Sequence, residues 1–153
     1  YGHVMVMFDP LKSYNSTRLT HKKIGCSISL LKNYMKSPFL NEKKIAENNL
    51  SFSIYDSFPV SKGHSLIIPK RIVADIFDLN DEEYKSCFDL VKTVKEIIKN
   101  KFNPDGFNVG VNSGETAGQT IFHAHIHVIP RYEGDVPNPR GGVRNVIPDK
   151  ADY

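Results

Sequence analysis

Three of the six histidines in this 153-residue chain alternate along one short segment, as His123, His125 and His127. Successive side chains on an extended strand point to opposite faces, so these imidazoles would share one face, about 6–7 Å apart, while the apolar residues between them face the core. Aligned imidazoles add little to stability, because buried polar groups are costly unless they are paired. The pattern therefore predicts a site with a chemical task.

Two kinds of chemistry suit three neighbouring imidazoles. Imidazole is a common metal ligand, and histidines on one face can share an ion. A neutral imidazole is also a good nucleophile toward phosphorus, provided that its other nitrogen donates a hydrogen bond that fixes the tautomer.

The residues beside the histidines favour the nucleophile. The upstream segment 112–119 reads Asn-Ser-Gly-Glu-Thr-Ala-Gly-Gln, and its glycines let backbone N–H groups approach an anion closely. Asn112 and Gln119 offer further donors, and Arg131 lies downstream. These groups suit a phosphate and add no metal ligand. Each also has an ordinary alternative, as a loop amide or a solvated surface arginine.

The elements that would position these residues can be predicted from hydrophobic periodicity. Four segments have the apolar pattern and turn-forming borders of strands: 50–55, 65–68, 107–111 and 123–129. Pro69 and Pro130 are expected to end two of them. Asn80 and Glu83 predict a capping box at the start of a long helix that ends before Pro104. Strand pairs on either side of one long helix predict an α+β domain, with an antiparallel sheet of about five strands, one long and one short helix.

The first part of the chain shows weaker patterns. A short strand is expected over 3–8 and an amphipathic helix from Ile24 to Met35, and a further short helix over 73–79. Residues 1–36 are too few to hold a core of their own. We therefore expect 1–36 to be an N-terminal extension, or the tail of an upstream domain, without an assigned function, and 37–153 to be the catalytic domain.

The composition excludes several classes of protein. Hydrophobic residues make up 40% and charged residues 24% of the chain, as in soluble globular proteins, and neither a membrane-spanning run nor a signal-peptide pattern is present. The two cysteines are far apart and form no disulfide framework, which favours a cytoplasmic location. A net charge of +3 without a dense basic run suits a small anionic substrate and predicts no nucleic-acid polymer as partner.

Three stretches in order carry a family resemblance: Pro59-Val60-x-x-Gly63-His64-x-Leu66-x-x-Pro69, Gly118-Gln119-Thr120-x-x-His123-x-His125-x-His127-x-x-Pro130-Arg131, and Pro139-Arg140-Gly141-Gly142-Val143-Arg144-x-Val146-Ile147-Pro148. With them, the sequence from about Ser37 to Tyr153 resembles the histidine triad (HIT) family of nucleotidyl hydrolases and transferases. It is most similar to bacterial-type members of the dinucleoside polyphosphate hydrolase branch, which includes the fragile histidine triad proteins.

The resemblance implies a role for each histidine. The middle histidine of the triad is the family's nucleophile, so His125 would attack the α-phosphorus of a substrate such as diadenosine tetraphosphate. The nucleotidyl-histidine so formed would then be resolved by water. His123 and His127 would orient His125 and hydrogen-bond the phosphate, and Gln119 would position the leaving phosphate.

The resemblance also implies the groups that bind the substrate. His64 would line the same pocket, Asn112 and Arg131 would contact phosphates, and Asp56 would accept hydrogen bonds from the ribose hydroxyls. For Asp56 a turn-capping role is the ordinary alternative. The resemblance further implies a homodimer joined edge to edge at the sheets, and it leaves open whether Mg²⁺ accompanies the substrate.

One departure from the family concerns zinc. Many bacterial members carry Cys-Pro-x-Cys near the start and a histidine just after a Pro-Lys-Arg stretch, and with another histidine these bind a structural zinc. Here Ser37-Pro38-Phe39-Leu40 and Ile72 stand at these positions. Such a site needs about four ligands, so no cofactor and no structural zinc is expected. A stoichiometric zinc signal from the purified protein would contradict this.

Several functions remain open at this point. A nucleoside phosphoramidase or a dinucleotide phosphorylase would share the triad, and Gln119 before it favours the polyphosphate branch. A nucleotide-binding sensor with little turnover would keep the pocket without the chemistry. Metal binding by the triad is the remaining alternative.

Overall fold

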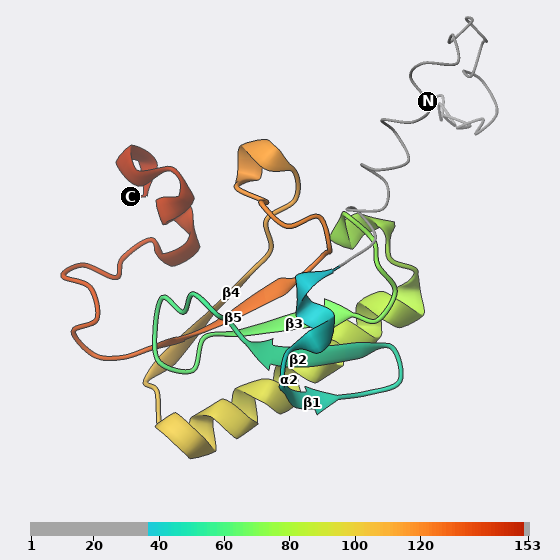
Figure 1. Cartoon of the computed structure of the whole chain (residues 1–153). Helices are drawn as coiled ribbons and strands as arrows, with labels where there is room; N and C mark the ends of the chain where they lie inside the picture. Colours follow the sequence, from blue (N-terminus) through green and yellow to red (C-terminus); the bar gives the residue numbers. More distant parts are fainter. Residues whose placement is uncertain (1–36, 152–153) are drawn as a thin grey trace, which may run out of the picture. The chain divides into compact units, whose positions relative to one another are not determined.

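Residues 37–151, which the computed structural model describes, form a five-stranded antiparallel sheet with one long helix against one face (Figure 1). The strands are β1 Lys44–Glu47, β2 Ser51–Tyr55, β3 Ser65–Pro69, β4 Gly106–Gly110 and β5 Ile126–Arg131, in the spatial order β1-β2-β3-β5-β4. The helix is α2 Asp81–Phe102, and the 3-10 turns are η1 Pro38–Asn41, η2 Ile76–Asp78, η3 Glu115–Ala117, η4 Gly142–Val146 and η5 Pro148–Lys150. The predicted α+β class is confirmed, while the expected elements over 3–8 and from Ile24 to Met35 lie outside the described residues.

The long helix begins where the capping box was predicted. The Asn80 side chain accepts from the Glu83 N–H at 2.9 Å, and the Glu83 carboxylate accepts from the Asn80 N–H at 3.1 Å. Arg71 binds the same carboxylate and lowers the pKa of Glu83 to about 2. At the other end Asn103 adopts a left-handed conformation with φ 48°, which is a common way to end a helix.

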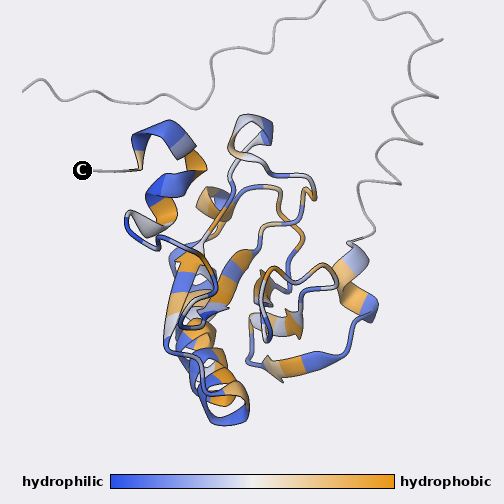
Figure 2. Ribbon diagram, turned by 90° about the vertical axis from the view of Figure 1, so that its left-hand side faces the viewer, coloured by the Kyte–Doolittle hydropathy of each residue, from blue (hydrophilic) through white to orange (hydrophobic). Residues whose placement is uncertain are grey.

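Successive side chains of the central strands point to opposite faces of the sheet, so they form two separate apolar clusters. The cluster on the side of α2 contains Ile67, Ile76, Cys87, Leu90, Val94, Ile98, Ala124, Ile126 and Val128. The cluster on the opposite face contains Phe39, Phe52, Ile54, Leu66 and Ile68. Figure 2 shows the matching mixture of apolar and polar residues along the strands and α2. Within α2, Cys87, Leu90, Val94 and Ile98 are buried, whereas Tyr84 is 40% exposed.

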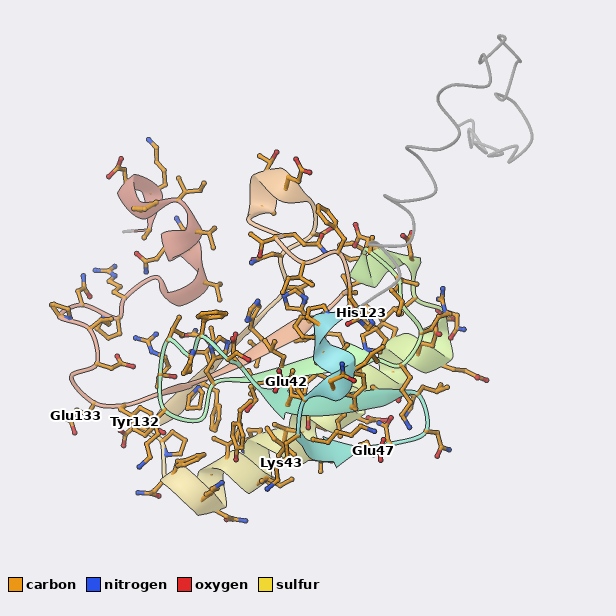
Figure 3. All side chains as sticks on the ribbon, viewed as in Figure 1. Glu42, Lys43, Glu47, His123, Tyr132 and Glu133 are labelled. Carbon is orange, nitrogen blue, oxygen red and sulfur yellow. The ribbon has the colours of Figure 1, made fainter. Side chains whose placement is uncertain are left out.

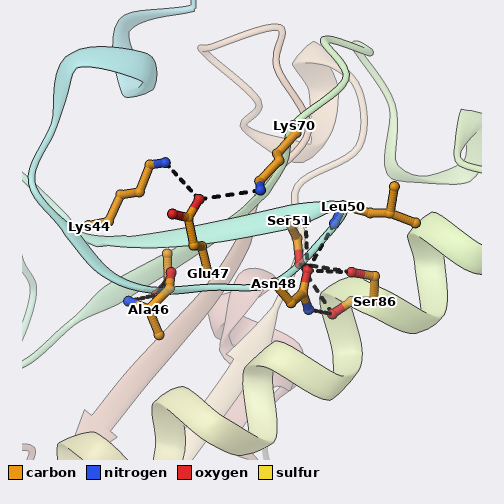
Figure 4. A network of polar contacts seen from close by, with 9 residues as sticks. Lys44, Ala46, Glu47, Asn48, Leu50, Ser51, Lys70 and Ser86 are labelled. Carbon is orange, nitrogen blue, oxygen red and sulfur yellow. Dashed lines mark hydrogen bonds and ion pairs between the residues drawn. The ribbon is translucent and has the colours of Figure 1, made fainter.

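A polar network joins the β1–β2 turn to α2 (Figure 4). The Asn48 amide donates to the Ser86 carbonyl at 2.9 Å, and its oxygen accepts from the hydroxyls of Ser51 at 2.9 Å and Ser86 at 2.6 Å. Ser51 is fully buried, so these bonds satisfy a hydroxyl that would otherwise be costly to enclose. The network fixes one end of the sheet against the helix.

The two ends of the histidine strand differ from the prediction. The strand was expected over 123–129, but β5 starts at Ile126, opposite Ile67. Beyond that pair β3 reaches Pro69, which has no N–H to donate, and Ala124 instead donates to the Val73 carbonyl at 2.8 Å. The chain therefore joins the sheet only after the first two triad histidines.

The expectation that Pro130 ends this strand is also corrected. Pro130 lies within β5, opposite Phe107 of β4, and the strand continues to Arg131. The last residue of β5 that pairs with β3 is Val128, opposite Ser65. On the side of β5 that faces β3, the Pro130 carbonyl lies beyond the first residue of β3. It accepts there from the Ser61 hydroxyl at 2.7 Å instead. A missing N–H on that side costs no ladder hydrogen bond.

Two further elements differ from expectation. Strand β1 was not predicted, because Lys44–Glu47 contains only two apolar residues between charged ones. The short helix expected over 73–79 is the single turn η2, which Asp75 caps by accepting from the Phe77 N–H at 3.0 Å. Among residues 37–151 no helix combines the length and apolar character needed to cross a membrane.

Candidate active site

The triad histidines do not form the single row that the sequence predicted. His127 lies on β5 opposite Leu66, which places it on the sheet face away from α2. The His125 ring lies beside it, with ring centres 5.0 Å apart at an angle of 71°. His123 contacts Ser37 and Pro69 instead and lies close to η1 (Figure 3). The row is broken because the chain joins the sheet only at Ile126.

The hydrogen bond of His125 fixes its tautomer. Its Nδ1 lies 2.7 Å from the His123 carbonyl oxygen. A carbonyl can only accept, so the proton is on Nδ1 and the lone pair is on Nε2. This Nε2 has no protein partner within residues 37–151. The ring is 8% exposed, and Phe39 packs edge-on against it at 5.2 Å. His125 therefore presents Nε2, the nitrogen without a protein partner, at the surface of the site.

A hollow of about 290 Å³ opens in front of His125. Its lining combines apolar side chains, two hydroxyls, two carboxylates and two imidazoles: Pro38, Phe39, Glu42, Ile54, Asp56, Ser57, Phe58, Leu66, Thr120, Ile121, His125 and His127. An apolar wall with a few convergent polar groups is typical of a small-molecule site. We call it the His125 hollow.

A chain of hydrogen bonds orients His127. The Val60 N–H donates to His64 Nδ1 at 3.3 Å, so His64 carries its proton on Nε2. That Nε2 lies 3.0 Å from His127 Nδ1, which must accept. His127 consequently has its proton on Nε2. The structure thus brings His64 together with His125 and His127, as the resemblance implied for the pocket.

The environment keeps these imidazoles neutral. Burial lowers the pKa of His127 to about 4, and positive charge on His125 or His64 would oppose its protonation further. Burial also lowers the pKa of His64, although the Asp56 carboxylate 3.5 Å from its Nδ1 acts in the opposite direction. Burial thus disfavours the protonated form of both rings.

His123 has both of its ring nitrogens committed to the protein. Nδ1 lies 2.6 Å from the Ser37 hydroxyl, and Nε2 lies 2.9 Å from the Pro69 carbonyl oxygen. The residue is 1% exposed and does not line the His125 hollow, and burial lowers its pKa. Direct contact of its side chain with a phosphate in that hollow would require these two bonds to break.

Gln119 and Asn112 lie in the glycine-rich loop before the triad. The Gln119 amide is buried, donates to the carbonyls of Ala74 at 2.6 Å and Ile121 at 3.2 Å, and accepts from the Gly114 N–H at 2.9 Å. Asn112 donates to the Gly118 carbonyl at 3.5 Å. The structure places neither side chain in the lining of the His125 hollow. In this conformation Gln119 secures the loop to the segment before η2.

Asp56 lies at the edge of the same hollow as His125 and His127. One carboxylate oxygen accepts from the Phe58 N–H at 2.8 Å, which is the turn-capping bond expected of an aspartate there. The other oxygen is the one that lies 3.5 Å from His64 Nδ1. Asp56 therefore serves the turn and also faces the site.

Arg131 lies away from the triad. Its guanidinium holds the Asp135 carboxylate through two bonds of 2.6 and 2.7 Å and donates to the Asn108 side chain at 2.7 Å. It lines a separate hollow between β4 and the C-terminal segment and does not line the His125 hollow. The pairing with Arg131 lowers the pKa of Asp135 to about 2. The structure thus does not bring Arg131 to the other predicted site residues.

Two metal-binding arrangements can be tested against these contacts. Among residues 37–151, Asp56, His64 and His127 have ligand atoms within 4.8 Å of one another, but a shared ion at the facing nitrogens would displace the His64–His127 hydrogen bond. At the positions of the family's zinc ligands, Leu40 and Ile72 have no donor atom, so the residues present do not fit that ion. The expectation of no structural zinc stays a prediction.

Sequence reasoning missed several groups that hold the site. Ser37 and Phe39 reach the triad from η1, although Ser37 is 86 residues before His123. The Val60 N–H and the Pro69 carbonyl are backbone groups, whose direction no side-chain pattern reveals. The one signal available was the position of Ser37 directly before a proline, which is a common start of a helical turn.

Comparison with known proteins gives a consistent result. The family model described as HIT domain matches residues 39–134. A HIT family protein from Bacillus anthracis has a similar crystal structure, with a TM-score of 0.60 and 39% identity, over 73% of this chain and 74% of that one.

Two relatives have named activities. The adenosine 5'-monophosphoramidase hnt1 of Schizosaccharomyces pombe is 42% identical over 58% of this chain and 63% of that protein. The bis(5'-adenosyl)-triphosphatase of Dictyostelium discoideum is 39% identical over 58% of this chain and 60% of that protein. The chain spans 62% to 64% of the length of the first curated relatives that it matches.

Proposed function

The chain belongs to the HIT family, and on that premise we propose that it is a nucleotidyl hydrolase in which His125 attacks the α-phosphorus of a dinucleoside polyphosphate. The observation that carries the proposal is the geometry of His125. Its Nδ1–H is anchored to a carbonyl, and its Nε2 lone pair faces a hollow of nucleotide-compatible size and lining.

The first step forms a bond from His125 Nε2 to the α-phosphorus and breaks the bond from that phosphorus to the bridging oxygen. The leaving oligophosphate takes the bonding electrons. His127 supports its departure, because its Nδ1 accepts from His64 and its Nε2–H is left to donate to the leaving oxygen. The product of this step is a nucleotidyl-histidine.

The second step releases the nucleotide. Water attacks the same phosphorus, the phosphorus–nitrogen bond breaks with its electrons returning to His125 Nε2, and the proton that the water loses passes to solvent. His127 keeps its Nε2–H throughout and hydrogen-bonds a phosphate oxygen, and burial, which lowers the pKa of His64 and His127, keeps this donor and acceptor pattern in place. For diadenosine tetraphosphate and water the products are AMP and ATP.

The His125 hollow also offers groups for the nucleoside. Ile54, Leu66 and Phe58 give an apolar wall for a purine ring, and Phe58 is 88% exposed, so its ring can close on a base. The Asp56 carboxylate at the same edge suits the ribose hydroxyls as an acceptor. Asn112 is proposed to contact phosphates through the glycine-rich loop, and Gln119 to position that loop.

The test is cleavage of diadenosine tetraphosphate in ¹⁸O-labelled water by the wild type and by His125→Gln. We expect AMP carrying the label and unlabelled ATP from the wild type, and a rate at least roughly 10³-fold lower from the variant, because it has no nucleophile. Rapid acid-free quenching should trap adenylate on the peptide that contains His125.

The control is a binding measurement on the same variant. His125→Gln should retain AMP binding and a wild-type circular dichroism spectrum, since the hollow keeps its other lining residues. Unchanged turnover in the variant would contradict the proposal and would favour a nucleotide sensor with adventitious activity. Label in ATP rather than AMP would place the attack at another phosphorus.

A phosphoramidase is the second candidate, because the S. pombe relative with that name is as similar to this chain as the triphosphatase is, over an equal share of it. Its substrate would meet the same His125 and His127. Release of AMP from adenosine 5'-phosphoramidate, with no cleavage of diadenosine tri- or tetraphosphate, would favour it. A phosphorylase would instead need inorganic phosphate and would give ADP.

A further inference from the structure

We propose that Ser37 is a positioning residue for His125 and that it acts through His123. This inference rests on the proposed function, in which His125 is the nucleophile. Ser37 caps η1, on the sheet face away from α2, and its hydroxyl lies 2.6 Å from His123 Nδ1. Ser37 and His123 are 8% and 1% exposed, so solvent is largely excluded from this bond.

The direction of the bond follows from its neighbours. His123 Nε2 lies 2.9 Å from the Pro69 carbonyl oxygen, which can only accept, so His123 carries its proton on Nε2. Its Nδ1 therefore has a lone pair, and the Ser37 hydroxyl must donate to it. The Ser37 oxygen in turn accepts from the Phe39 N–H at 3.3 Å. The Ser37 hydroxyl thus donates to His123 and accepts from the Phe39 N–H.

The position of the His123 side chain affects His125 through the backbone of His123. Its carbonyl oxygen accepts from His125 Nδ1–H and so determines which nitrogen of His125 keeps the lone pair. Residues 123–125 precede β5, so no neighbouring strand holds that carbonyl. The Ala124 N–H also ties this segment to the Val73 carbonyl, at 2.8 Å. The His123 side chain is therefore a principal anchor for the carbonyl.

The same short segment also restrains the His125 ring. Phe39, two residues after Ser37, packs edge-on against His125 at 5.2 Å and tilted against His123 at 5.9 Å. Phe39 is 6% exposed, within the apolar cluster of that face. The cap by Ser37 holds this turn in place, so the hydroxyl supports His125 by two routes, through the His123 carbonyl and through the Phe39 ring.

The experiment compares Ser37→Ala, Ser37→Thr and Ser51→Ala as full chains. Ser51→Ala is the matched control, because it removes another buried serine hydroxyl, one that bonds to Asn48 rather than to the site. We measure kcat and KM on diadenosine tetraphosphate well below the unfolding temperature. We also record imidazole ¹⁵N–¹H spectra, with the His125 signal identified by its absence in His125→Gln.

We expect Ser37→Ala to lower kcat about tenfold with KM changed less than about twofold, as for other supporting hydrogen bonds around a reacting group. The His125 spectrum should change from a single Nδ1–H tautomer to a mixture. Ser37→Thr keeps the hydroxyl and should restore the single tautomer, and Ser51→Ala should leave both readouts at the wild-type value.

Two results would overturn the inference. One is a wild-type kcat and His125 spectrum in Ser37→Ala, which would make Ser37 a helix cap only. The other is a lower kcat with an unchanged His125 tautomer, because the effect would then not pass through His125. If the wild type cleaves no dinucleotide, the proposed function fails, while the spectra still decide whether Ser37 positions His125.

Discussion

Hydrogen bonds divide the four histidines of the site into two pairs. His125 depends on the backbone of His123, whereas His127 depends on the side chain of His64. The first pair leaves a lone pair on Nε2 of His125, and the second leaves an N–H on Nε2 of His127. In the proposed mechanism the same residue type thus supplies a nucleophile and a hydrogen-bond donor, because each ring has a different partner on its other nitrogen.

This arrangement makes the free energy of unfolding depend on pH. The pKa of His127 is about 4 in the folded chain against an ordinary value of 6.5, and burial also lowers the pKa of His64 and His123. Between pH 4 and 6.5 the unfolded chain binds more protons than the folded one, so stability increases with pH in that window and is lost as the solution becomes acidic.

We therefore expect the urea midpoint to decrease when the pH is lowered from 7.5 to 5. The free energy of unfolding should decrease by at most about 1.4 kcal/mol per pH unit for each such histidine. His127→Gln cannot be protonated and should flatten the slope. A midpoint independent of pH over this range would show that the buried rings titrate normally.

At the scale of elements, two connections hold the site against the sheet. The loop before the triad is tied to the segment before η2, by Gln119 on the Ala74 carbonyl and by Ser113 on Asp75 at 2.6 Å. The β2–β3 connection is tied to β5 by Ser61, and it carries His64 at its end. Irregular segments can place reacting groups because regular elements support them.

Gly63 is the residue on which the second connection depends. It has φ of +88°, and a Cβ there would lie 2.8 Å from the Phe102 ring at the end of α2. Gly63→Ala should therefore lower the free energy of unfolding by about 1–3 kcal/mol, from backbone strain and from the clash.

The matched control is Gly106→Ala, because Gly106 lacks a positive φ and its nearest atom would be 3.9 Å away. It should change the stability by less than about 0.5 kcal/mol. Urea denaturation gives the free energy of unfolding of both variants. Equal values would contradict the prediction and would show that the β2–β3 connection accommodates a side chain at Gly63.

At the scale of the whole molecule, the two edges of the sheet differ in charge. Edge strand β1 carries Lys44 and Glu47, which pair at 2.7 Å, and charged side chains discourage strand addition. Edge strand β4 has the sequence Gly-Phe-Asn-Val-Gly, without a charge, and Val109 on it is 39% exposed. If the homodimer implied by the family resemblance forms, β4 is the edge that suits it.

We expect light scattering after gel filtration to give twice the chain mass. Val109→Lys should shift the protein toward the monomer, because a charge would then face the partner strand. Ile72→Lys is the control, since Ile72 has a similar exposure of 38% and lies outside the sheet. A monomeric wild type, or equal masses for the two variants, would exclude β4 as the edge at which a dimer forms.

The sequence determined what depends on near neighbours. Periodicity predicted four strands that the structure contains, the capping box of Asn80 and Glu83 is confirmed, and the ordered motifs identified the family. These features have a local cause, because strand alternation and helix caps involve residues a few positions apart. The missed strand β1 lacks such a pattern, and its place follows from pairing with β2.

Only the tertiary structure decided how the triad is used. The alternation of His123, His125 and His127 predicted three rings in one row on a strand, but β5 starts after the first two, because Pro69 has no N–H to continue the ladder. The partner of His123 is Ser37, 86 residues away, and the Arg131 guanidinium lies on Asp135 rather than at the triad. Spacing along the chain gives the residue types of a site, while their hydrogen-bond partners depend on which distant segments pack beside them.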